Sequence, residues 1–99
     1  MRCAVCGARA VHNHHAIYRQ HLRQHGGDVL DAANFLPVCL SCHAAHHNAS
    51  RRIPVRCLRD ENLAYASDLL GLAAFDYFVR RYADDGDPRL DELLEEEAA

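Results

Sequence analysis

The chain has 99 residues, a formal net charge of −3 and five cysteines. A chain of this length forms one domain with a small core, which a structural metal would help to stabilise. Its apolar runs are much shorter than the about 20 residues that cross a bilayer, so we expect no membrane partner. The N-terminal residues Met-Arg-Cys-Ala-Val-Cys contain no hydrophobic leader. We therefore expect a cytoplasmic protein, in which paired cysteines favour a metal over disulfides.

The charge is divided unevenly between the two halves of the chain. Residues 1–59 carry eight arginines against two acids, a formal charge of +6, and they include all eight histidines. Residues 60–99 carry three arginines against twelve acids, a formal charge of −9. A basic, histidine-rich surface suits a polyanion, but ordinary solvated charge explains the same asymmetry about as well.

The first half predicts two strands and a helix after a thiol-bearing turn. Gly7 directly follows Cys6 and suits a tight turn in which backbone amides approach sulfur. The Gly26-Gly27 pair should end a short helix. In chain order, the predicted elements are a turn over 1–10, a strand over 11–17, a helix over 17–25, a loop over 28–34, a strand over Phe35–Val38 and a helix over 40–48.

The second half predicts helices after a basic connector over residues 49–59. We expect helices over 61–70, with Asp60 as N-cap and Gly71 as stop, over 72–82, and over 89–99. The last of these follows an Asp87 cap and Pro88 at the first helical position. Apolar residues recur at helical spacing, and we assign them to the core without a chemical role: Leu63, Ala66, Leu69, Leu70, Phe75, Phe78, Val79 and Tyr82.

Two Cys-x-x-Cys pairs predict a structural zinc site. Each of the pairs, Cys3 with Cys6 and Cys39 with Cys42, can bind one face of a zinc tetrahedron. The 32 residues between them exceed the spacing of a simple zinc ribbon, and an inserted pair of strands would account for the difference. Four buried reduced thiols are the alternative, and Cys57 reads as a core thiol. The order of elements is that of a treble-clef zinc fold in the α+β class.

Histidines at two places in the chain predict a second, open metal site. His43 and His47 are four residues apart and share one helix face. If His14 meets them, three imidazoles surround a cation and leave positions for water and phosphate. His15, left unligated, could accept a proton from water. His12 shares a strand face with His14 and is an alternative ligand.

The order of these motifs resembles the HNH endonucleases, the zinc-stabilised ββα-metal nucleases, over residues 3–48. The matching pattern is Cys-x-x-Cys, Val-His-Asn-His-His, Gly-Gly and then Asn-Phe-Leu-Pro-Val-Cys-x-x-Cys-His-x-x-x-His. The resemblance implies that His14 and His43 bind the catalytic cation and that His15 is the general base. Asn34 matches the family's central asparagine, which holds the strand connection and thereby orients the base. His47 matches a position that is a ligand in some members and replaced in others.

The resemblance implies hydrolysis of DNA phosphodiester bonds that leaves 5′ phosphate and 3′ hydroxyl ends. The implied cofactors are a structural Zn²⁺ and a catalytic Mg²⁺, Mn²⁺, Ni²⁺ or Zn²⁺. A backbone carbonyl near Ala16 or Asn34 is expected to orient His15. Four arginines of the basic half are candidates for contacts with DNA phosphates: Arg19, Arg51, Arg52 and Arg56.

Two other roles remain open. One is a non-catalytic treble-clef zinc finger that binds nucleic acid or protein, which explains the thiols but not the positions of the histidines and of Asn34. The other is an accessory nuclease subunit of a phage DNA-packaging terminase, because residues 10–70 also resemble small HNH proteins of phages and prophages. This role would place the protein in a bacterial host cell. We expect residues 1–59 to form the nuclease core and residues 60–99 a helical extension packed on the same domain. His21, His25 and His46 match no family position and read as solvent-facing or hydrogen-bonded histidines.

Overall fold

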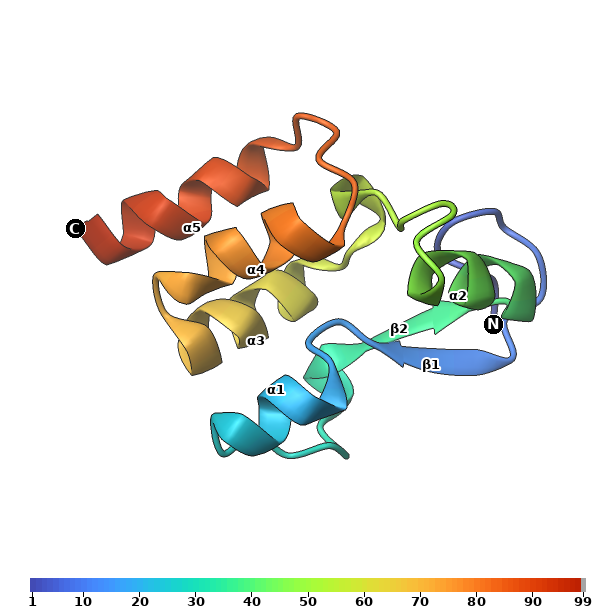
Figure 1. Cartoon of the computed structure of the whole chain (residues 1–99), viewed down its shortest axis with the longest axis horizontal. Helices are drawn as coiled ribbons and strands as arrows, with labels where there is room; N and C mark the ends of the chain where they lie inside the picture. The colour runs from blue at the N-terminus through green and yellow to red at the C-terminus, as the bar shows by residue number, and fades with distance from the viewer. Residues whose placement is uncertain (99) are drawn as a thin grey trace.

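One two-stranded antiparallel sheet and five α-helices make up the part of the chain that the structure describes (Figure 1). The computed structural model describes the backbone of residues 1–98 and the side chains of residues 1–94. The elements, with η for 3₁₀ turns, are β1 (His12–His15), α1 (Arg19–Gln24), η1 (Ala32–Asn34), β2 (Phe35–Val38), α2 (Leu40–His47), η2 (Val55–Cys57), α3 (Asp60–Leu70), α4 (Ala73–Arg81) and α5 (Pro88–Ala98). The predicted α+β class is confirmed. None of the described helices has the length and apolar character needed to cross a bilayer.

The two strands pair antiparallel, with His14 opposite Leu36, and we call this pair the hairpin. Residues 16–34, which include α1 and η1, connect the two strands. The predicted strand over residues 11–17 is longer than β1. The Ala16 amide still donates to the backbone carbonyl of Asn34 at 2.9 Å, but at Ile17 the side chain of Asn34 replaces the backbone as partner. Its Oδ1 accepts the Ile17 amide at 2.8 Å, and its Nδ2 donates to the Ile17 carbonyl at 3.0 Å. Asn34 therefore holds the backbone that follows β1 through two side-chain hydrogen bonds.

Two short helices flank this hairpin (Figure 1). Helix α1 corresponds to the helix predicted over residues 17–25, but it begins only at Arg19. It ends as predicted, because Gly26 adopts a φ of +76° and the amide of Gly27 donates to the Leu22 carbonyl at 2.7 Å. Helix α2 follows β2 directly and lies over the hairpin beside the N-terminal loop.

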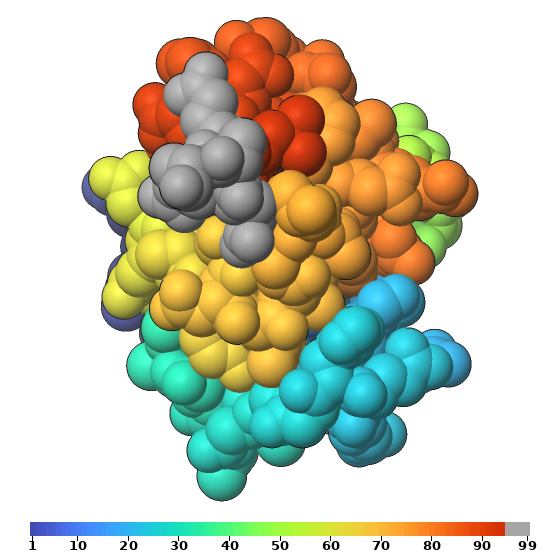
Figure 2. All heavy atoms as spheres, turned by 90° about the vertical axis from the view of Figure 1, so that its left-hand side faces the viewer, coloured from blue at the N-terminus to red at the C-terminus, as the bar shows by residue number. Residues whose placement is uncertain are grey.

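Helices α3, α4 and α5 pack beside one another beyond one end of the strand pair, to the left of α2 in Figure 1. Figure 2 shows this face, with α5 uppermost, α3 and α4 below it and α1 at the bottom. Gly71 ends α3 and Asp87 caps α5 through the Arg89 amide at 2.9 Å, both as predicted. The predicted end of the last helix at Ala99 lies outside the described residues.

The prediction of Asp60 as the N-cap of α3 is wrong. Arg59 occupies that position, and its amide donates to Oδ1 of Asn62 at 3.0 Å. Asp60 is already helical, and its carboxylate pairs with Arg89 at 2.8 Å. The side-chain Nδ2 of Asn62 also donates to the carbonyls of Ala33 and Phe35, at 2.8 and 3.1 Å. Asn62 thus ties α3 to the start of β2.

The end of α4 carries Tyr82 into the core next to the hairpin. On α4 itself Tyr77 is buried, whereas Val79 of the predicted apolar stripe is exposed. After Tyr82 the chain pairs with the connector, since the amide of Ala83 donates to the Ile53 carbonyl at 3.0 Å. The Tyr82 side chain is therefore held in a fixed position within reach of β1.

Candidate metal centres

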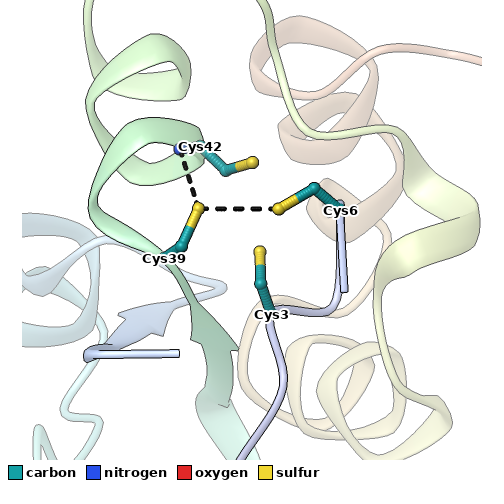
Figure 3. Close-up of side chains that lie close together, drawn as sticks. All are labelled: Cys3, Cys6, Cys39 and Cys42. Atoms are coloured by element: carbon teal, nitrogen blue, oxygen red, sulfur yellow. Dashed lines mark hydrogen bonds between the residues drawn. The ribbon is translucent and has the colours of Figure 1, made fainter. Parts of the chain in front are cut away.

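Four cysteine side chains converge between the N-terminal loop and the start of α2 (Figure 3). The Sγ atoms of Cys3, Cys6, Cys39 and Cys42 all lie within 4.8 Å of one another. Cys6 and Cys39 Sγ are 3.7 Å apart. Zinc–sulfur bonds of about 2.3 Å in a tetrahedron require a separation of about 3.8 Å between sulfurs. The cluster could therefore hold a zinc ion.

Backbone amides point toward two of these sulfurs. The Val5 amide donates to Cys3 Sγ and the Cys42 amide to Cys39 Sγ, both at 3.4 Å. Burial raises the pKa of Cys3, but hydrogen bonds from backbone amides outweigh that effect and lower its pKa to about 6. Burial and the neighbouring thiols raise the pKa of Cys42 to about 12. The raised pKa of Cys42 means that all four thiols can become thiolates only if a cation among them offsets the charge. This is the condition for a metal site.

Three imidazoles from two distant segments form a second cluster. His14 comes from β1, and His43 and His47 come from α2, with one ligand atom of each within 4.8 Å of the others. The Nε2 atoms of His43 and His47 are 2.9 Å apart. Tetrahedral zinc would set two nitrogens about 3.3 Å apart. His12 has its ring centre 5.2 Å from that of His43 but does not belong to this cluster.

Tyr82 selects the tautomer of His14. The Tyr82 hydroxyl donates to the Ala16 carbonyl at 2.6 Å, so it accepts a hydrogen bond from Nε2 of His14 at 2.8 Å. Nδ1 of His14 is buried and has no partner among the described residues, so its lone pair is free. Burial and repulsion by His46, His43 and His47 lower the pKa of His14 to about 2. His14 is therefore a neutral imidazole with one nitrogen available for an ion.

His15 is oriented by a backbone carbonyl, but not by one of the two expected. Its Nε2 donates to the carbonyl of Val29 at 3.0 Å, rather than to that of Ala16 or Asn34. The loop before η1 supplies this acceptor, and no spacing within β1 indicates it. The ring of Phe35 packs edge-on against His15, with ring centres 5.2 Å apart. This arrangement leaves the lone pair of His15 Nδ1 free to accept a proton.

All three histidines of β1 line a pocket of about 370 Å³. Its lining residues are His12, Asn13, His14, His15, Tyr18, Arg19, His43 and His47. Arg19 is the only one of the four predicted phosphate-binding arginines in this lining.

The other three predicted arginines have partners outside the pocket. Arg51 donates to Cys42 Sγ at 3.8 Å, and Arg52 donates to the Arg80 carbonyl at 2.6 Å. Arg56 pairs with Asp85 at 3.1 Å. Their role in binding DNA stays a prediction.

Sequence reasoning missed three side chains around the imidazole cluster. The sequence assigns Tyr82 to the core, gives no signal for Tyr18 and matches His46 to no family position. His46 is buried and hydrogen-bonded at both nitrogens, which agrees with the expectation of a histidine with satisfied partners. A phenol hydroxyl within an apolar stripe requires a polar partner, and this is the signal that could have identified Tyr82.

A Tyr82→Phe variant should bind the ion of the imidazole cluster about 10- to 100-fold more weakly while remaining folded. Phenylalanine fills the same space, but without the hydroxyl His14 can place its proton on either nitrogen. Calorimetric titration with a divalent ion measures the affinity. Tyr65→Phe is the matched control, because Tyr65 does not line the pocket. Equal affinities in both variants would contradict the role of Tyr82.

Comparisons with known proteins do not assign this chain to a family. No protein-family model matches it, and neither do the curated proteins nor the solved structures with which it was compared. The case for a function therefore depends on the geometry of two clusters, one of thiols that could hold zinc and one of imidazoles that faces a pocket.

Proposed function

We propose that this protein is a metal-dependent endonuclease of the HNH type, with a treble-clef core formed by β1, β2 and α2. The observation that carries the proposal is the meeting of His14 with His43 and His47 beside an unligated His15. A zinc finger that only binds has no need for three converging imidazoles at an open pocket. Hydrolysis of a phosphodiester can be catalysed by a divalent cation together with a general base that is not bound to it.

The imidazole cluster suits a divalent cation because it offers three nitrogen donors that differ in exposure. His14 is buried with a free Nδ1, while His43 is half-buried and His47 is exposed. Nitrogen donors tolerate Mn²⁺, Ni²⁺ or Zn²⁺ better than an all-oxygen site does. When bound, such a cation supplies a Lewis acid that offsets the charge developing on the phosphate and on the leaving 3′ oxygen.

His15 would act as the general base in this reaction. Because its Nε2 donates to Val29, Nδ1 can take a proton from a water molecule in the pocket. Asn34 would keep the base in place, since it binds both backbone groups of Ile17, two residues after His15. Positioning of this kind is a large part of the catalysis of phosphoryl transfer.

The test of this proposal is cleavage of supercoiled plasmid by the zinc-loaded protein. We expect nicked and linear products once Mg²⁺, Mn²⁺, Ni²⁺ or Zn²⁺ is added, and none with chelator. Absence of cleavage with all four ions, although zinc is bound and the protein is folded, would favour the non-catalytic zinc finger. Cleavage only in the presence of a phage terminase would identify an accessory subunit.

Arg19 is the side chain best placed to bind the phosphate. It is exposed, lines the pocket and has no described hydrogen bond or ion pair. Arg19→Ala should weaken binding of DNA duplexes of any sequence. It should also reduce the slope of log binding constant against log salt concentration by about one. Fluorescence anisotropy at several salt concentrations measures both. Arg23→Ala, on the same helix but away from the pocket lining, is the control, and an equal effect there would show only general charge attraction.

A further inference from the structure

Tyr18 is one of the residues that line the pocket. Its ring lies beside those of His14 and His47, with ring centres 5.9 and 5.7 Å away. Its hydroxyl oxygen is 2.7 Å from Nε2 of His46, a buried side chain outside the imidazole cluster. The hydroxyl of Tyr18 is thus positioned by a hydrogen bond with His46, a histidine that has no other role in the proposed reaction.

The hydrogen bonds behind Tyr18 have a defined direction. The amide of Ile53 donates to Nδ1 of His46 at 3.0 Å, so that nitrogen carries a lone pair. A neutral imidazole then has its proton on Nε2, and it donates this proton to the Tyr18 oxygen. The Tyr18 oxygen is therefore an acceptor in its one described bond. Its own hydrogen has no acceptor among the described residues.

We propose that the Tyr18 hydroxyl donates a hydrogen bond to a non-bridging oxygen of the phosphate that occupies the pocket. This inference rests on the proposed function and adds to it a neutral donor beside Arg19. A phenol has a pKa of about 10 in water and so keeps its hydrogen at neutral pH. The donation from His46 polarises the hydroxyl and makes it a better donor. No proton leaves Tyr18 in this role.

Tyr18 and Arg19 would then divide the recognition of the anion. The guanidinium supplies charge that reaches any phosphate along a DNA strand, whereas the hydroxyl is fixed by His46 and favours one oxygen position. A fixed donor is most effective where negative charge increases during the reaction. Loss of the hydroxyl should therefore slow cleavage more than it weakens binding of intact DNA, whereas loss of Arg19 should mainly weaken binding.

The experiment compares wild type, Tyr18→Phe and Tyr65→Phe, all zinc-loaded and supplied with Mg²⁺. With inorganic phosphate as the probe, we expect the Tyr18 variant to bind about 10- to 100-fold more weakly than the other two proteins. In wild type labelled with ¹³C at tyrosine, phosphate should shift the Tyr18 signals, recognised by their contacts to the His47 ring. This measurement needs no variant to fold. Plasmid cleavage by the same proteins should fall by a similar factor only in Tyr18→Phe.

The outcomes separate this inference from the proposed function. If wild type cleaves DNA but Tyr18→Phe matches it in rate and in phosphate affinity, Tyr18 is not the donor and the nuclease proposal stands. If wild type binds phosphate through Tyr18 but does not cleave, the oxyanion site stands without hydrolysis. Unchanged tyrosine signals at saturating phosphate overturn the inference.

Discussion

A Cys39→Ser variant is expected to lose its zinc and, with it, the folded state. Cys39 lies at the junction of β2 and α2, and the cluster joins that junction to the N-terminal loop. A structural zinc contributes on the order of 10 kcal/mol, while a domain is stable by only about 5–15 kcal/mol in all. Zinc content by mass spectrometry and thermal unfolding by circular dichroism measure the two effects.

Cys57→Ser is the matched control for the zinc prediction. Cys57 is half-buried and does not belong to the thiol cluster, so this variant should keep one tight zinc and most of its stability. The interpretation of the cluster as a metal site would fail if Cys39→Ser remained folded and its midpoint of thermal unfolding equalled that of wild type. The four thiols would then be packing groups only.

Both clusters could be predicted from the sequence because their ligands occur in pairs at short, regular spacings. Cys39 with Cys42 and His43 with His47 are related by one helical turn, so the geometry of α2 fixes how each pair is placed. The turn after Cys6 and the end of α1 follow from glycines with positive φ. The hairpin then brings His14 to α2, because β2 leads directly into that helix.

Long-range hydrogen bonds could not be predicted in the same way. Tyr82 meets His14 across 68 residues, and Tyr18 meets His46 across 28. Such pairs depend on how α4 and the connector pack on the hairpin, and no periodicity encodes that packing. The N-cap of α3 differs from the predicted Asp60 for a related reason. Asn62 both caps the helix and binds the carbonyls of Ala33 and Phe35, a role that a local capping rule does not consider.

A His15→Ala variant should bind both metals but cut plasmid DNA about 10²- to 10⁴-fold more slowly, which is the usual contribution of a general base. His15 is outside both clusters of possible ligands, so its loss should leave zinc content and folding unchanged. Its ring packs on Phe35 and binds Val29 at the surface of the pocket, and truncation there removes little of the buried core. Single-turnover cleavage, with metal content measured on the same sample, tests the prediction.

Two comparison variants separate the base from the ligands. His43→Ala should also abolish cleavage, but it should do so by losing the exchangeable ion while the thiol-bound zinc remains. His25→Ala, an exposed histidine outside the pocket lining, should cleave at the wild-type rate. Only a base predicts a variant that retains every ion and loses the reaction. If His15→Ala cleaves normally, the proton must pass to another group, and the assignment of His15 as the base is wrong even if the protein is a nuclease.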